Sequence, residues 1–437
     1  MPHAVNATHD PSLRSWVESA NPPDTDFPIQ NLPLGVFHGP DRTQPRVGVA
    51  IGDRILDLTA CHQAGLLADL PPALWAAVTA STLNPLMALG HEVNHQLRQR
   101  LQQLLRAGNP PAAAEQILVP MKAATMHLPA TVGDYTDFYA SIFHATNVGS
   151  LFRPENPLLP NYKHIPVAYH GRSSSLVVSG TPIPWPQGQR KGPDEDRPSF
   201  GPCRALDYEL EVGCFIGAGN SWGQPLAIAQ AESALFGLCL VNDWSARDIQ
   251  AWEYQPLGPF LGKSFATTVS PWVVTLEALA PFRCPAFARP AADPVPLPYL
   301  TSAENTERGG LDLTVEVWLQ STQMQNQGMA PYQLSRANLR QMYWTPAQMI
   351  AHHTSNGCNL RPGDLLASGT VSGLEAGSQG SLLEMTRRGT QPLQLPSGEA
   401  RAFLAAGDTV ILRGYCHKPG YVRIGLGDCQ GRVLPAI

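Results

Sequence analysis

Alternating acidic and apolar residues between positions 207 and 212 constrain the fold of this chain more than any other feature. Asp207, Glu209 and Glu211 are separated by single large apolar or aromatic residues. Successive side chains of a β-strand point to opposite faces, so a strand here places the three acids on one face. Acids are disfavoured in strands, and like charges side by side repel. The pattern therefore indicates either a solvated edge strand or a site where a cation is bound.

The chain segment from residue 235 to residue 254 predicts a buried strand followed by a polar helix. Residues 235–241 are an apolar run of strand length, and Asp243 stands where the strand gives way to a helix. Helical spacing then places Asp243, Arg247, Gln250 and Tyr254 on one polar stripe. Such a stripe is either a solvated helix face with one surface ion pair or part of a binding site.

A stiff loop follows this helix. Prolines and glycines between residues 256 and 262 end the helix and lead to Lys263 and Thr267. A rigid connection that ends in a lysine would hold a positive charge in a fixed place. It therefore favours the interpretation that the polar stripe is part of a binding site.

A second cluster of polar residues precedes these segments. Asp137, Tyr139 and His144 lie within eight positions, and Arg153 follows shortly after. A single histidine in a folded protein is more often a hydrogen-bonded structural group, but an acid and a phenol beside it could supply a base and an anion site. Glu384 stands alone among apolar neighbours, which by itself is typical of a structural or salt-bridged acid.

The ligands that these acids offer favour a hard cation. With Asp137 and Asp243, the alternating acids provide carboxylate oxygens without any thiolate nearby in the sequence. Oxygen-only ligand sets are typical of Ca²⁺ and Mg²⁺. The spacing does not choose between these two ions.

The 437 residues are enough for two domains. In the first part, residues 47–51 and 55–58 flank Gly52-Asp53 and predict a β-hairpin. Leucines between residues 97 and 105 recur at helical spacing and stop before a glycine and two prolines. We expect the domain boundary there, which gives an N-terminal domain of residues 1–115 and a C-terminal domain of residues 116–437.

Composition excludes several functional classes. The net charge is −5, so nothing suggests a nucleic-acid partner. No apolar run reaches the ~18 residues of a membrane span, and the first residues lack the basic and apolar regions of a signal peptide. The eight cysteines are scattered, which is typical of reduced thiols in a cytoplasmic protein. The chain contains 38 glycines and 42 prolines, a composition that is typical of a fold with many short strands and ordered turns.

Long motifs in a fixed order carry a resemblance over nearly the whole chain. They are FPIQNLPLGVF (27–37), DYTDFY with HATNVG (134–149), YHGRSSS (169–175), DYELE (207–211), NDWSARDIQAWEY (242–254) and RPGDLLASGT (361–370). In these motifs the chain closely resembles the fumarylacetoacetase family. The resemblance implies a mainly β fold with some α, made of an N-terminal SH3-like β domain and a C-terminal mixed β-roll. It also implies a homodimer.

The activity implied by the resemblance is hydrolysis of a carbon–carbon bond. The substrate, 4-fumarylacetoacetate, is a diketone with two carboxylates, and the products are fumarate and acetoacetate, in the last step of tyrosine and phenylalanine catabolism. By position, the resemblance assigns binding of Ca²⁺ or Mg²⁺ to Asp137, Glu209, Glu211 and Asp243. It associates a secondary cation site with Lys263 and Thr267.

The resemblance also assigns the groups that act on the substrate. His144 matches the base that activates water, and Glu384 matches the acid that orients this base. Arg247 and Lys263 match groups beside the developing negative charge, which preorganised cations stabilise. The residues that match substrate contacts are Tyr139, Arg153, Tyr169, Gln250, Tyr254 and Thr370.

Two rival functions remain open from the sequence. One is a metal-dependent decarboxylase or hydratase that acts on 2-oxo acids, against which the presence of both His144 and Glu384 and the full-length match argue. The other is a metal-stabilised binding protein without activity. This second rival is disfavoured because every expected catalytic position is present.

Overall fold

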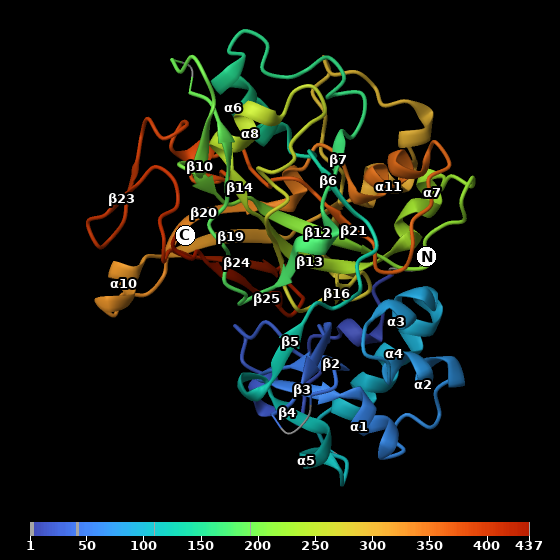
Figure 1. The fold of residues 1–437 in the computed structure, drawn as a ribbon. Coiled ribbons are helices and arrows are strands. Elements are labelled where there is room, and N and C mark those ends of the chain that lie inside the picture. Colours follow the sequence, from blue (N-terminus) through green and yellow to red (C-terminus); the bar gives the residue numbers. More distant parts are fainter. Residues whose placement is uncertain (1–3, 41–42, 109, 193, 437) are drawn as a thin grey trace.

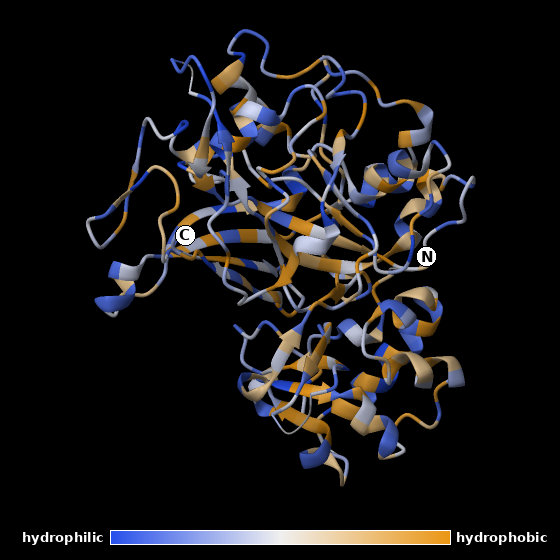
Figure 2. Cartoon of the chain, in the orientation of Figure 1, coloured by the Kyte–Doolittle hydropathy of each residue, from blue (hydrophilic) through white to orange (hydrophobic). Residues whose placement is uncertain are grey.

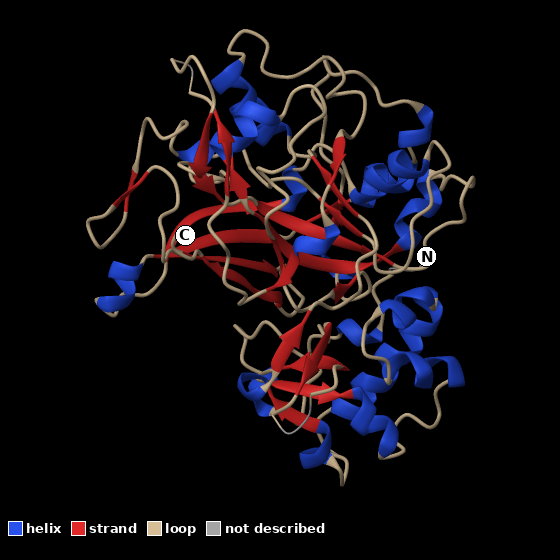
Figure 3. Cartoon of the chain, viewed as in Figure 1, coloured by secondary structure: helices blue, strands red, loops and turns tan. Residues whose placement is uncertain are grey.

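The computed structural model describes residues 4–40, 43–108, 110–192 and 194–436. As predicted, the fold is mainly β with some α, and its smaller N-terminal part lies below the larger C-terminal part in Figure 1. Strands form the centre of both parts, and the helices lie around them (Figure 3). Every helix within the described residues is too short or too polar to span a bilayer.

The N-terminal part is built on a five-stranded antiparallel sheet, the β domain that we expected. Its strand order is β4-β3-β2-β1-β5. The predicted hairpin is confirmed: Ile51 of β2 pairs with Arg54 of β3, and Gly52 in the turn has φ +57°, which favours glycine. The strands are β1 (Leu34–His38), β2 (Arg46–Ile51), β3 (Arg54–Asp57), β4 (Leu118–Pro120) and β5 (Thr125–His127).

Helices cover this sheet. The predicted leucine-rich helix is α4 (Gly90–Leu105), and Leu97, Leu101, Leu104 and Leu105 are all buried, as helical spacing requires. The other helices are α1 (Leu58–Gln63), α2 (Pro72–Val78), α3 (Asn84–Ala88) and α5 (Ala114–Ile117).

Strands β4 and β5 follow residue 115 and still pair within the N-terminal sheet. The division into residues 1–115 and 116–437 stays a prediction, and this pairing adds residues 118–127 to the first sheet.

An eight-stranded mixed sheet is the centre of the C-terminal part. Its order is β7-β6-β21-β12-β13-β15-β8, and β16 also pairs with β13. The strands are β6 (Tyr135–Phe138), β7 (Ala168–His170), β8 (Leu176–Val178), β12 (Leu210–Ile216), β13 (Leu235–Asp243), β15 (Thr267–Val269), β16 (Val274–Thr275) and β21 (Leu365–Ala367).

Both faces of this sheet are buried. Val212 and Leu240 belong to a core with the second large sheet, whereas Phe215 and Val241 belong to a core shared with the N-terminal helices and strands. The strands of the central sheet are accordingly coloured as strongly apolar in Figure 2. Residues of β12 and β13 are buried along their entire length, as expected of strands covered on both faces.

The second sheet has the order β20-β19-β24-β25 and contains β19 (Thr314–Gln320), β20 (Tyr332–Asn338), β24 (Thr409–Cys416) and β25 (Ile424–Arg432). Two-stranded pairs are β9 (Gln187–Arg190) with β10 (Ser199–Pro202), β11 (Leu206–Asp207) with β14 (Ser245–Ala246), β17 (Arg283–Cys284) with β18 (Gly310–Leu311), and β22 (Leu393–Gln394) with β23 (Ala400–Arg401). The helices are α6 (Ile142–Phe152), α7 (Ile228–Ala231), α8 (Arg247–Glu253), α9 (Ala303–Arg308), α10 (Thr322–Asn326), α11 (Pro346–Thr354) and α12 (Leu382–Met385).

The alternating acids differ from the expected single strand. Regular pairing stops between β11 and β12, at Tyr208 and Glu209, where the Glu209 N–H bonds to the Asn242 side chain. The edge-strand interpretation is wrong, because β12 is hydrogen-bonded on both sides, to β13 and β21. The acids are therefore inside the protein.

The polar stripe of residues 243–254 also differs from the prediction. Asp243 is still part of β13, paired with Thr267, and the helix begins only at Arg247. Asp243 therefore approaches the site from a strand end, whereas Arg247 and Gln250 approach it from helix α8.

Candidate active site

Four carboxylates from different elements converge at one end of the central sheet. Asp137 comes from β6, Glu209 from the break before β12, Glu211 from β12 and Asp243 from the end of β13. One oxygen of each lies within 4.8 Å of those of the others, and all four residues are buried. Sheet pairing brings them together, since β6, β21, β12 and β13 are adjacent strands. This group is called the acidic cluster below.

The acidic cluster fits a bound cation. Oδ1 of Asp137 and both carboxylate oxygens of Glu211 are buried without a hydrogen-bond partner among the described residues. Burial, together with repulsion by neighbouring carboxylates, raises the pKa of Asp137 and of Glu211 well above the usual range. A buried carboxylate without a partner is costly, and a divalent cation would satisfy it. The acidic cluster could therefore hold a metal ion.

Lys263 contacts two members of the acidic cluster directly. Its ammonium donates to Glu209 and, at 2.6 Å, to Asp243. Burial alone would lower the pKa of Lys263, but attraction to Asp243 and Glu209 outweighs it and raises the pKa, so the side chain is positively charged. The lysine offsets part of the charge of the acidic cluster by donating to it. The secondary cation site expected at Lys263 and Thr267 stays a prediction.

Two hydroxyl groups orient Asp243. The Thr267 hydroxyl donates to Oδ1 at 2.8 Å, and the Tyr169 hydroxyl donates to Oδ2 at 2.9 Å. Tyr169, a predicted substrate contact, thus lies beside the acidic cluster. It belongs to strand β7, which pairs with β6. Asp243 is held by three donors, including Lys263, which leaves little freedom for its carboxylate.

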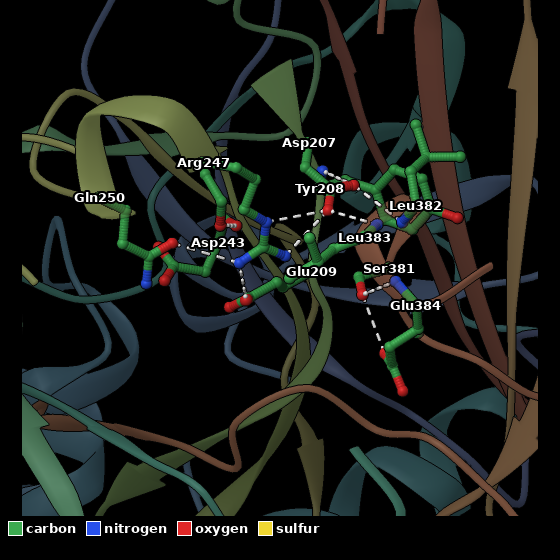
Figure 4. A network of polar contacts seen from close by, with 12 residues as sticks. Asp207, Tyr208, Glu209, Asp243, Arg247, Gln250, Ser381, Leu382, Leu383 and Glu384 are labelled. Carbon is green, nitrogen blue, oxygen red and sulfur yellow. Dashed lines mark hydrogen bonds and ion pairs between the residues drawn. The ribbon is translucent and has the colours of Figure 1, made fainter. Parts of the chain in front are cut away.

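Arg247 connects the acidic cluster to a further acid. Its guanidinium donates to Glu209 at 2.8 Å and to Gln250 at 3.3 Å, and it forms an ion pair with Asp207 at 2.9 Å (Figure 4). Burial opposes its charge, but Asp207 and Glu209 outweigh this effect and raise the pKa of Arg247. A planar, permanently charged fork is thereby fixed at the start of α8.

His144 and Glu384 form a buried pair. His144 lies near the start of α6, whose N-cap is Ser141, and its Nδ1 is 2.7 Å from Oε2 of Glu384 on α12. Attraction to His144 overcomes burial and lowers the pKa of Glu384, so the acid is ionised and its partner nitrogen carries the proton. This tautomer leaves Nε2 as an acceptor.

Two further residues predicted to contact substrate are Tyr139, which packs against His144, and Thr370. The Tyr139 ring packs edge-on against the His144 ring, with centroids 5.2 Å apart. The Thr370 hydroxyl is buried without a hydrogen-bond partner among the described residues. The predicted substrate contacts of both residues stay predictions.

Arg153 and Tyr254 are less closely connected. Arg153 caps the end of α6 and donates to the Pro157 carbonyl at 3.2 Å. Tyr254 caps the end of α8 and is 40% exposed. Within the described residues, no hydrogen bond or ion pair of either residue reaches the acidic cluster. Their substrate contacts stay predictions.

Sequence reasoning placed Asn147 in the polar cluster around His144 but did not connect it, or two serines, with Glu384. Ser372 and Ser381 donate to Oε2 at 3.0 and 2.8 Å, and Asn147 donates to Oε1 at 2.9 Å. The Ser-x-x-Glu pattern of residues 381–384 was an available signal, because it is typical of a helix N-terminus. Ser381 is indeed the N-cap of α12, but the Glu384 side chain turns to His144.

Each part of the chain matches a model of a known protein family. Residues 30–129 match the model described as Fumarylacetoacetase N-terminal, and residues 135–434 match Fumarylacetoacetate (FAA) hydrolase C-terminal. The fumarylacetoacetase of Homo sapiens is 50% identical over 421 residues, covering 95% of this chain and 97% of that protein. The fumarylacetoacetase of Caenorhabditis elegans is 50% identical over 425 residues, covering 95% and 98%.

Among solved structures, a fumarylacetoacetate hydrolase from psychrophilic Exiguobacterium antarcticum is similar. Its TM-score is 0.51 at 16% sequence identity, with 93% of this chain and 100% of that chain covered. At this identity the likeness concerns the fold alone.

Proposed function

The chain belongs to the fumarylacetoacetase family and hydrolyses fumarylacetoacetate, and we propose that it does so with a bound divalent cation and a water molecule activated by His144. The reaction consumes one water and gives fumarate and acetoacetate. The observation that carries this mechanism is the His144–Glu384 pair, together with buried carboxylate oxygens that have no hydrogen-bond partner among the described residues.

His144 is the proposed general base. A neutral imidazole near pH 7 is matched to accept a proton from water, and Nε2 is the nitrogen left for this task. Glu384 holds the ring through Nδ1 and stabilises the imidazolium that forms. The hydroxide oxygen then bonds to the carbonyl carbon, and the carbonyl π electrons move to its oxygen.

Cleavage of the carbon–carbon bond follows. The electron pair of the oxyanion re-forms the carbonyl, and the broken bond leaves its electrons on the acetoacetate carbon as an enolate. A bound divalent cation would polarise the diketone and stabilise this enolate charge. Arg247 and Lys263 are charged and fixed before the reaction, which favours the states in which negative charge develops. The proton taken up by His144 is then available to the acetoacetate carbon.

Binding of the substrate is assigned to groups around this centre. The substrate is a dianion, so we propose that Arg153 and the phenols of Tyr139, Tyr169 and Tyr254 bind its ends. Gln250 and Thr370 complete the proposed contacts. The Thr370 hydroxyl, which is buried without a hydrogen-bond partner among the described residues, and the packing of Tyr139 on His144 support this assignment.

We propose Ca²⁺ or Mg²⁺ as the cation at Asp137, Glu209, Glu211 and Asp243. These residues offer only carboxylate oxygens, the ligands that both ions prefer. By family membership we further propose a homodimer, a cytoplasmic location and a role at the end of tyrosine and phenylalanine breakdown. Separate domains of residues 1–115 and 116–437 belong to the same proposal.

The test is direct. The protein is incubated with 4-fumarylacetoacetate while loss of the diketone absorbance and formation of fumarate are followed. Matched reactions contain 2-oxo acids. Stoichiometric fumarate and acetoacetate are expected from the diketone alone. Turnover of 2-oxo acids with an inert diketone would replace this function by a decarboxylase or hydratase, and no turnover of either would leave a binding protein.

A further inference from the structure

Asp207 is a buried acid that the proposed chemistry does not use. Its side chain is fully inaccessible to solvent, and it lies outside the acidic cluster. It is the first of the alternating acids in the sequence, and its strand β11 pairs with β14 just before helix α8. A buried carboxylate at this position needs partners that compensate its desolvation.

One group of partners comes from α8. Nε and Nη2 of Arg247 both lie 2.9 Å from Oδ2 of Asp207. The same guanidinium donates to Glu209 through Nη1. Asp207 therefore fixes the plane and direction of the cation that is proposed to stabilise developing charge.

A second group of partners comes from α12. The Leu382 N–H donates to Oδ1 at 2.8 Å, and the Leu383 N–H donates to Oδ2 at 2.9 Å. The next residue along this short helix is Glu384, the partner of His144. Figure 4 shows Asp207 between Arg247 on one side and residues 382 and 383 on the other.

We propose that Asp207 is a positioning residue that fixes Arg247 and Glu384 relative to each other. Its single carboxylate orients the Arg247 guanidinium directly. Through α12 it also positions Glu384, which orients the general base His144. This inference rests on the proposed function. It explains why an acid that is not a cation ligand is buried between two elements that lie far apart in the sequence.

An amide cannot replace this carboxylate. Among the described residues, every hydrogen bond of the Asp207 carboxylate comes from a donor: Nε of Arg247 and the N–H groups of Tyr208, Leu382 and Leu383. Nη2 of Arg247 adds an ion pair. In Asp207→Asn, the NH₂ group must face donors on one side or the other, although the shape of the side chain is almost unchanged. At Oδ2 the NH₂ group would face Arg247 and Leu383, and at Oδ1 it would face Tyr208 and Leu382. Helix α12 therefore loses one of its two bonds in either orientation, and Arg247 loses its bond in one of them.

The chain contains a matched control. Asp408 is also fully buried and accepts from Nε and Nη2 of Arg401 at 2.9 and 3.0 Å, and from the Ala405 N–H at 2.9 Å. Its described partners include no residue of the active site. Asp408→Asn therefore imposes the same kind of loss on the fold without disturbing Arg247 or Glu384.

The experiment compares Asp207→Asn and Asp408→Asn with the wild-type protein, loaded with Mg²⁺ or Ca²⁺, in fumarylacetoacetate hydrolysis. Asp207→Asn is expected to lower kcat by about 10- to 100-fold, the usual effect of losing a group that orients a functional residue. KM and bound divalent ion should change far less. Asp408→Asn should keep its kcat, whether or not its Tm falls.

A double-mutant cycle supplies the second readout. The loss in kcat for Asp207→Asn combined with Glu384→Gln should be smaller than the product of the single losses, because both act on His144. Asp408→Asn with Glu384→Gln should give the full product. If Asp207→Asn does not fold, Asp207→Ser, which leaves a hydroxyl and room for water, takes its place.

Each outcome decides the inference. A kcat for the Asp207 variants equal to that of Asp408→Asn, or strictly multiplicative losses, would overturn it. Failure of both Asp207 variants to fold where Asp408→Asn folds would assign Asp207 a structural role instead. If the wild-type protein does not hydrolyse fumarylacetoacetate, the proposed function fails, which is distinct from a negative result for Asp207.

Discussion

Nδ1 of His144 lies 2.7 Å from Oε2 of Glu384, although the two residues are 240 positions apart in the chain. Three further donors surround this carboxylate: Asn147, Ser372 and Ser381. An acid with so many donors stays ionised in a buried place, and attraction to His144 lowers its pKa. The pair therefore has the arrangement of a base with a fixed tautomer.

Glu384→Gln tests the orienting acid. The amide keeps the shape but removes the negative charge that stabilises imidazolium, so kcat should fall, though less than in His144→Ala. The double mutant should be little worse than His144→Ala alone, because the pair acts as a unit. Glu316→Gln is a suitable control, since Glu316 is also buried but bonds to Arg336 and Trp318. If steady-state kinetics show that the kcat losses of the two single mutants multiply in the double mutant, Glu384 has a role other than orienting His144.

Lys263→Met tests charge stabilisation. Methionine keeps much of the volume of lysine but removes the ammonium that contacts Glu209 and Asp243. The loss should appear mainly in kcat, because the positive charge acts on states in which negative charge develops. Lys418→Met removes a lysine that donates to the Pro281 carbonyl and lies over the Tyr421 ring, outside the proposed site, and should leave kcat unchanged. A rise in KM alone would make Lys263 a binding group.

Glu211→Gln tests the cation site. Glu211 has no hydrogen-bond partner for its carboxylate oxygens among the described residues, so this change disturbs few protein contacts. The variant should fold but lose bound divalent ion and activity together. Prolonged dialysis against a chelator should inactivate the wild-type protein reversibly, with recovery on addition of Mg²⁺ or Ca²⁺. Full activity with excess chelator would refute the site.

The stability of the metal-free protein should depend on pH. Burial raises the pKa of Asp137 and Glu211 in the folded state, whereas in the unfolded chain both are near 4. The folded state therefore binds more protons, and its stability falls as pH rises above about 4. Bound cation replaces these protons, so the gain in Tm on adding Mg²⁺ or Ca²⁺ should grow with pH. A gain that is constant between acidic and neutral pH would contradict this explanation.

Local sequence patterns predicted several elements correctly. The hairpin around Gly52 and the leucine-rich helix α4 follow from short-range turn and periodicity rules. Glu211 lies in the strand that alternation predicts. In these cases the local pattern and the tertiary environment require the same structure.

Other features depend on contacts that no local pattern records. The strand break at Tyr208 and Glu209 depends on Asn242, which bonds to the Glu209 N–H from β13. Pairing with Thr267 keeps Asp243 in β13 and delays the helix to Arg247. The tie between Glu384 and His144 joins short elements that are far apart in sequence. Family resemblance suggested this tie, whereas the contacts of Asp207 with Arg247 and α12 became evident only in three dimensions.

The most direct test of the mechanism is the kcat of His144→Ala, measured together with its bound divalent ion. The side chain forms no part of the acidic cluster, so the variant should fold and retain the cation. Its kcat should fall by about 10²- to 10⁴-fold, the usual scale for a positioned acid–base group. A His144→Ala protein that keeps its cation and hydrolyses fumarylacetoacetate at nearly the wild-type rate would contradict the mechanism.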